Sequence, residues 1–192
     1  MNSALGFTIK SGWACAVVLD GPRTSPEVAV SRRIELSDPA DAHGRQPYHA
    51  STGTARKPGR ELEKLLASVE QFGRQSVDAF LREQEKAGRQ LEGAGIVVGS
   101  LIDPAQIAND HIRIHALEGQ LFRGIVKGAT DRRRLKSSVW RERDLYEFAA
   151  GRLKRSETDL RQTISGLGRS VDGPWRAEHK AAAIAAWLVM TK

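Results

Sequence analysis

LGFTIKSGWACAVVLDGPRTSPEVAVSRRIEL, residues 5–36, is the stretch that decides the fold. It contains three runs rich in apolar residues, at 5–9, 13–19 and 28–36, and the first of them alternates strictly. Ser11-Gly12 and Asp20-Gly21-Pro22, whose residues favour turns, separate the runs. We therefore predict that the chain opens with three antiparallel strands.

The next segment changes character abruptly. Residues 37–59 are rich in Pro, Asp, Gly, His and Arg and show no apolar period, which predicts a long loop. A loop of this length inside a compact domain is functional or mobile. Apolar residues then recur at three- and four-residue spacing, which predicts an amphipathic helix over 60–87.

From residue 94 onward, strands and helices are expected to alternate. The continuous apolar run at 94–102 is typical of a strand that is buried on both faces of a sheet. The last helix is rich in alanine, so it can approach a sheet closely, and Trp187 is expected to close one side of the core. The remaining predicted elements are a helix over 108–127, an edge strand over 137–141, and helices over 145–153, 157–165 and 178–190.

Length and composition limit the class of protein. The 192 residues fit one domain, 1–192, and the single cysteine, Cys15, lies in an apolar run where it is expected to pack in the core. The sequence has no apolar stretch near the roughly 20 residues that cross a bilayer and no signal-peptide pattern, so we expect a cytoplasmic protein without a membrane partner. The net charge of +7 favours a polyanionic partner, although 23 acidic residues are mixed among the 30 basic ones.

The predicted order is strand-strand-strand-helix-strand-helix-strand-helix, with an extra helix before the end. This order resembles the ribonuclease-H-like superfamily, and the spacing of the first three strands is most similar to RuvC-type resolvases. The resemblance implies an α/β fold with a mixed sheet flanked by helices. It also implies acidic residues in the middle of the first strand, at the end of the fourth and near the start of the last helix, where they hold two divalent cations.

This sequence departs from that acidic pattern. The first-strand position falls on Thr8, or on Lys10 if the register shifts by two, and neither is a carboxylate. The fourth strand ends at Gly99-Ser100, with Asp103 beyond it, and the last helix opens with Glu178. Hard cations need oxygen ligands, usually carboxylates. We therefore expect no conventional two-metal site and predict no cofactor, with a divalent cation as the less favoured alternative.

A different kind of site is expected at the same edge of the sheet. Ligands of open α/β sheets bind beyond the carboxyl ends of the strands. By that rule Lys10, Ser11 and Ser100 should lie close together, and Lys180 joins them if the last helix packs as the resemblance implies. Lysines, hydroxyls and helix N-termini together favour a phosphate or carboxylate ligand.

A stripe of polar residues lies on the helix predicted over 108–127. His111, His115 and Glu118 are spaced by four and three residues, so they share one side of the helix, beside its apolar face. They are expected to form hydrogen bonds within the protein or to act in catalysis, with His115 as general acid or base and Glu118 orienting it. The stripe lacks the fuller motif of helical zinc proteases, and we predict no metal there. Glu118 is also, with Glu178, an alternative partner for the two lysines.

Two further segments are candidates for recognition. Tyr48 and His49 lie in the long loop, where they serve either recognition or anchoring of the loop to the body. A candidate nucleic-acid patch is formed by basic residues near the edge strand, with solvated loop charge as the alternative: Arg132, Arg133, Arg134 and Arg141.

The leading functional expectation is a protein that binds nucleic acid or another phosphorylated ligand without two-metal cleavage. The first alternative is a hydrolase or nuclease acting through His115 and Glu118. The second is a regulatory or scaffold protein with an inert site. Oligomeric state does not follow from the sequence.

Overall fold

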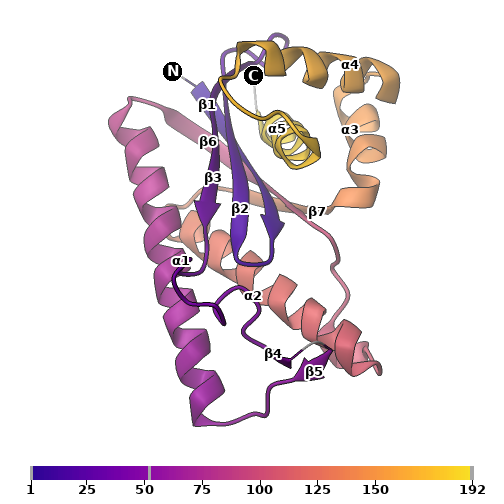
Figure 1. The fold of residues 1–192 in the computed structure, drawn as a ribbon. Helices are drawn as coiled ribbons and strands as arrows, with labels where there is room; N and C mark the ends of the chain where they lie inside the picture. The colour runs from indigo at the N-terminus through magenta and orange to yellow at the C-terminus, as the bar shows by residue number, and fades with distance from the viewer. Residues whose placement is uncertain (1, 52, 191–192) are drawn as a thin grey trace.

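A five-stranded mixed sheet with the order β3-β2-β1-β6-β7 forms the centre of the molecule (Figure 1). The computed structural model describes residues 2–51 and 53–190. The three N-terminal strands pair antiparallel as the sequence predicts, and β1, β6 and β7 pair in parallel. The strands are β1 (Asn2–Lys10), β2 (Trp13–Asp20), β3 (Glu27–Glu35), β6 (Gln90–Val98) and β7 (Ser137–Arg141).

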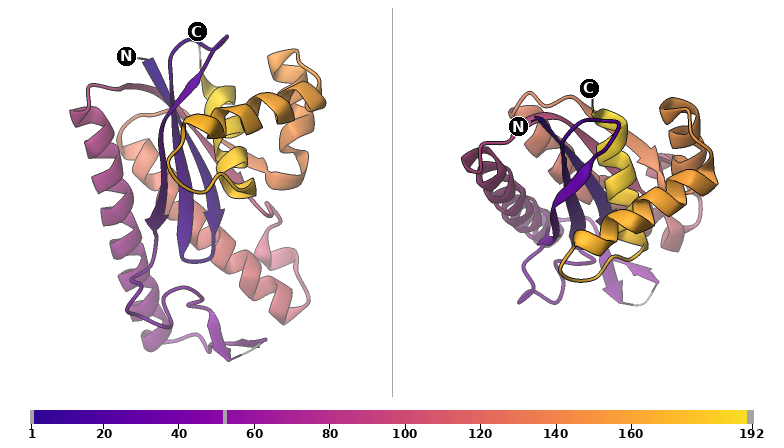
Figure 2. Two further views of the ribbon diagram at one scale, coloured as in Figure 1. Left: turned by 45° about the horizontal axis from the view of Figure 1, so that its top comes forward. Right: turned by 90° about the horizontal axis from the view of Figure 1, so that it is seen from above.

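Helices cover both faces of this sheet (Figures 1 and 2). One face carries α1 (Arg60–Lys86) and α2 (Asp110–Arg132), which pack against each other. The other face carries α3 (Leu145–Leu153), α4 (Glu157–Leu167) and α5 (Ala177–Val189). The described residues also include three short 3₁₀ turns, η1 (Pro104–Gln106), η2 (Glu142–Asp144) and η3 (Gly168–Ser170). The predicted α/β architecture is confirmed. No helix within the described ranges has both the length and the apolar character that a bilayer crossing needs.

The alternation in β1 explains why the molecule has two apolar cores. Successive side chains of a strand point to opposite faces. Leu5 and Phe7 belong to the core under α1 and α2, whereas Ala4 belongs to the core under α5. In β2 the residue Cys15 is buried in that second core, as expected, and burial raises the pKa of its thiol to about 12.

Two glycines allow α5 to lie directly on the sheet. Gly6 and Gly95 are partners in the parallel pairing of β1 with β6. A β-carbon on Gly6 would lie 1.7 Å from the carbonyl oxygen of Ala182, and one on Gly95 would lie 2.3 Å from that of Ala185. The alanine-rich helix therefore packs against glycine backbone, and Trp187 is buried beside it, as expected.

The fourth strand of the sheet does not have the predicted bounds. β6 spans Gln90–Val98 rather than 94–102, because the apolar run continues past the end of the strand. Leu101 and Ile102 are 44% and 59% exposed, so they are not core residues. Ser100 consequently lies in the loop that leaves the sheet. The following helix also runs further than predicted, to Arg132.

The segment at 37–59 is not wholly irregular. It contains a small hairpin of β4 (His49–Ser51) and β5 (Thr54–Ala55), at the end of the molecule far from both termini (Figure 1). Tyr48 is half-buried and packs against the core under α1 and α2. The backbone N–H of Arg56 donates to the carbonyl oxygen of Tyr48 at 2.7 Å. The loop is therefore anchored to the body, and β5 contacts α2.

Candidate functional site

A cavity of about 360 Å³ opens at the carboxyl ends of β1 and β6. We call it the carboxyl-edge cleft. Its walls are largely apolar and include Ile9, Val98 and Phe122. Polar side chains from three separate parts of the chain also line it: Lys10, Ser11, Ser100, His115, Gln120 and Arg123. The structure thus brings together Lys10, Ser11 and Ser100, which the sequence placed at this edge, and it adds His115 from the predicted stripe and Arg123.

The cations of the cleft differ in their ion pairing. The ammonium of Lys10 lies 3.1 Å from a carboxylate oxygen of Glu142, so its partner is neither Glu118 nor Glu178. Both side chains of this pair remain more than a third exposed. Arg123 is half-buried, and no ion pair engages it within residues 2–51 and 53–190. Arg123 is therefore the cation of the cleft whose charge is least compensated.

Lys180 does not line the cleft. The last helix does lie beside the first strand, because the buried hydroxyl of Thr8 donates to the carbonyl oxygen of Glu178 at 2.8 Å. Lys180 lies on α5, two residues after Glu178, and is half-buried. The expectation that it joins Lys10 and Ser100 in one pocket is thus not met by the geometry.

The residues at the superfamily's acidic positions do not suit a pair of hard cations. Thr8 already uses its hydroxyl in a hydrogen bond, and Gly99 and Ser100 carry no carboxylate. The carboxylate of Asp103 accepts the backbone N–H of Ala105 and caps η1. Of the described positions that the resemblance assigns to acids, only the start of the last helix carries a carboxylate, that of Glu178. One carboxylate does not make a two-metal site.

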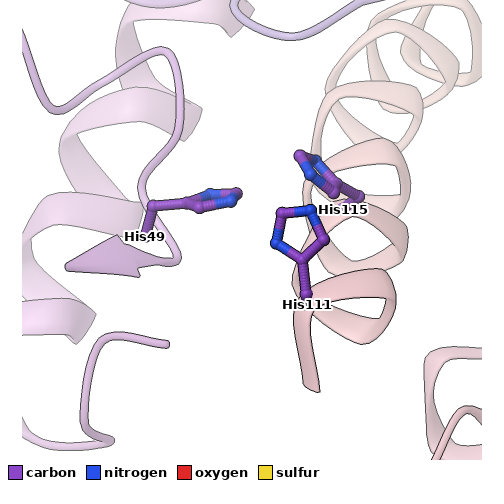
Figure 3. Close-up of side chains that lie close together, drawn as sticks. All are labelled: His49, His111 and His115. Carbon is purple, nitrogen blue, oxygen red and sulfur yellow. The ribbon is translucent and has the colours of Figure 1, made fainter. Parts of the chain in front are cut away.

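Three histidines converge beside the cleft (Figure 3). His49 comes from β4, and His111 and His115 come from the first turns of α2. One ring nitrogen of each residue lies within 4.8 Å of those of the other two. The ring centroids of His111 and His115 are 4.7 Å apart, and those of His49 and His115 are 4.9 Å apart. We call this group the three-histidine cluster.

Glu118 supports the cluster from the protein interior. Its carboxylate is buried, and Oε1 lies 2.7 Å from Nδ1 of His49. The other oxygen, Oε2, is 3.6 Å from Nδ1 of His115, which is too long for a hydrogen bond. Burial raises the pKa of Glu118, against the opposing hydrogen bond from His49, the charges of His49 and His115, and the backbone amide of Tyr48.

The sequence did not reveal the place of His49. The spacing on α2 predicts the stripe of His111, His115 and Glu118, but the loop position of His49 indicates only recognition or anchoring. The hydrogen bond between His49 and Glu118 joins the loop to that stripe. A loop without periodicity gives no indication of which helix it meets, so the only available signal was that few histidines occur in the chain.

The basic residues of the candidate nucleic-acid patch do not form one surface. Arg133 is paired with Asp78 at 2.6 Å and with Glu85 at 3.0 Å, both on α1. The run Arg132, Arg133 and Arg134 precedes β7, whereas Arg141 ends β7 and pairs with Asp144. A five-residue strand at about 3.3 Å per residue separates them by roughly 16 Å. The run therefore lies at the opposite edge of the sheet from the cleft.

Comparison with known proteins identifies the fold. No protein-family model and no curated protein sequence matches the chain. Among solved structures, the RuvC protein of Thermus thermophilus superposes with a TM-score of 0.54 at 10% sequence identity, over 97% of this chain and 92% of that one. RuvC of the same organism in complex with a Holliday junction substrate gives a TM-score of 0.55 at 9% identity, over 98% and 92%.

The chain therefore has a ribonuclease-H-like fold. Within that class it has the RuvC arrangement over nearly its whole length.

Proposed function

We propose that this protein binds nucleic acid through the carboxyl-edge cleft and does not cleave it by two-metal chemistry. The observation that carries the proposal is the position of the cleft. It lies at the carboxyl ends of β1 and β6, in a fold whose RuvC counterpart has been solved with a junction DNA substrate. Ligands of open α/β sheets bind at such an edge.

The chemistry of the cleft suits a phosphodiester with its attached nucleoside. Lys10 and Arg123 supply positive charge, and the hydroxyls of Ser11 and Ser100 supply donors. The apolar walls suit a sugar or a base, and a volume of about 360 Å³ is within the range of ligand pockets, roughly 300–1,000 Å³. The net charge of +7 adds long-range attraction for a polyanion.

The direct experiment is a binding titration with labelled single-stranded DNA, duplex DNA, a four-way DNA junction and RNA across a salt series. Binding through phosphate contacts weakens linearly in a plot of log affinity against log salt. The proposal expects such a dependence for at least one of these polymers. If none of them binds in a salt-dependent manner, nucleic acid is not the ligand.

A second candidate is hydrolysis of a phosphoester with His115 as general acid or base. The observation that favours it is that His115 is 46% exposed and lines both the cleft and the cavity beside the three-histidine cluster. His115→Ala should then abolish turnover and leave the melting temperature within a few degrees. Unfolding of this variant would instead assign His115 a structural role.

A further inference from the structure

Histidines are concentrated at one place in the molecule. The chain has five histidines, and four of them line a single cavity of about 330 Å³ beside the β4–β5 hairpin: His43, His49, His111 and His115. Gln46 and Ser51 supply further polar lining. The helical period of α2 explains why His111 and His115 lie together. His49 comes from the loop hairpin, and its ring also points toward this site (Figure 3). Four histidines around one cavity indicate a ligand that imidazole groups bind well.

The geometry of the three-histidine cluster is close to that of a metal site. Ligand nitrogens around tetrahedral zinc lie about 2.0–2.1 Å from the ion, which places them about 3.4 Å from one another. In the structure, one ring nitrogen of each histidine lies within 4.8 Å of those of the other two. His111 and His115 are exposed at the surface of α2, so rotation of their side chains can close the difference without moving the backbone.

Glu118 provides a second, independent indication. A histidine that ligates a metal commonly donates its other ring N–H to a carboxylate, which fixes the ring and raises its basicity. The carboxylate of Glu118 is hydrogen-bonded to Nδ1 of His49 at 2.7 Å, so Nε2 of that ring is left for a ligand. Its Oε2 is buried and has no hydrogen-bond partner among the described residues, and it points toward His115. A buried carboxylate held this way is a source of negative charge behind the three imidazoles.

From these observations we propose that His49, His111 and His115 bind one divalent ion of the zinc class, with Glu118 orienting His49 from behind. Imidazole ligands suit zinc and its neighbours in the first transition series, whereas magnesium and calcium require oxygen ligands. Three protein ligands leave a fourth position, which faces the cavity lined by Gln46 and Ser51. The site clamps β4 to the start of α2. The inference does not depend on nucleic-acid binding at the cleft.

The experiment uses the full chain after removal of metal by dialysis against a chelator. Zn²⁺ is titrated in competition with a chromophoric chelator, and Co²⁺ is then substituted so that its visible absorption reports the coordination. The proposal expects one equivalent of Zn²⁺, a Co²⁺ spectrum of tetrahedral type, and slower proteolysis of residues 37–59 when Zn²⁺ is bound. Absence of stoichiometric Zn²⁺ binding by the wild-type chain would overturn it.

Variants on α2 separate a metal site from general binding at the surface. His111→Ala removes a ligand from an exposed position, so the metal-free protein should keep its melting temperature while Zn²⁺ affinity falls by more than about 100-fold. Glu118→Gln should weaken Zn²⁺ by about 10- to 100-fold, as expected for the residue that orients a ligand.

The matched control is Arg113→Ala. Arg113 lies between the two histidines on α2, and its partner is Asp110. This variant should bind Zn²⁺ like the wild type. Wild-type affinity in His111→Ala, or an equal loss in Arg113→Ala, would contradict the assignment of the ligands.

Discussion

His49 and Glu118 are joined by a hydrogen bond of 2.7 Å that links the loop hairpin to the middle of α2. The side chain of Glu118 is 1% exposed and that of His49 is 10% exposed, so water competes little for this contact. A hydrogen bond that involves a charged group stabilises a protein by about 1.5–3 kcal/mol. The pair therefore positions the loop even when no ligand is present.

A double-mutant cycle in the metal-free protein tests this contact. His49→Ala and Glu118→Ala should each destabilise the chain, and the coupling free energy between them should be about 1–3 kcal/mol. The measurement is the free energy of unfolding of the wild type, the two single variants and the double variant in urea. Additive effects would show that the loop is held by other contacts.

The glycines beneath α5 predict a strong and local packing effect. Gly6→Ala places a methyl group against the carbonyl of Ala182, which forces β1 and α5 apart and should cost at least about 1–3 kcal/mol. Gly151→Ala is the control, because Gly151 lies in α3 and nothing outside the adjoining backbone of that helix lies within 4 Å of its β-carbon position. This control should stabilise the chain by up to about 1 kcal/mol. Equal melting temperatures for the two variants would show that α5 is not packed on the sheet as described.

His179 predicts a dependence of stability on pH. Burial lowers its pKa, with the charge of Glu178 acting in the opposite direction, and its Nδ1 accepts the backbone N–H of Arg176 at 3.2 Å. The unfolded chain therefore takes up this proton at a higher pH than the folded chain does. The contribution of neutral His179 to the free energy of unfolding is fully present above about pH 6.5, the ordinary pKa of histidine. It is lost as the pH falls through the lower pKa of the folded state. Urea denaturation at a series of pH values should show this loss, and His179→Gln should reduce it.

Cys15 should be inert in the native protein. Its thiol is buried, and a pKa of about 12 leaves almost no thiolate near neutral pH. A thiol-reactive chromophore should therefore label the chain quickly in denaturant and very slowly in buffer. Fast labelling of the native chain would show that β2 opens far more readily than its burial indicates.

Much of the fold could be predicted from the sequence, because it follows from local patterns of apolar residues. The apolar patterns predict β2, β3 and α1 within one residue of their observed ends, whereas β1 begins at Asn2, three residues before its predicted start. The end of β6 was misplaced, since exposed Leu101 and Ile102 resemble core residues in composition.

The candidate site could be predicted from the sequence only in part. Lys10, Ser100 and His115 meet because the carboxyl ends of parallel strands share an edge, which is a general property of the topology. The approach of His49 depends on the path of a loop, and the pairing of Lys10 with Glu142 depends on a short turn after β7. Tertiary contacts of this kind leave no periodic signal in a single sequence.

The most direct test of the account compares two double variants in nucleic-acid binding. Lys10→Gln with Arg123→Ala removes the charge of the carboxyl-edge cleft, whereas Arg132→Ala with Arg134→Asn removes exposed charge at the opposite edge of the sheet. Asparagine suits the positive φ of 56° at position 134. The account predicts that the cleft variant binds more weakly and that its salt slope becomes shallower by about one for each phosphate that is no longer neutralised, while the other variant binds like the wild type. Wild-type binding by the cleft variant, or an equal weakening in both, would contradict the account.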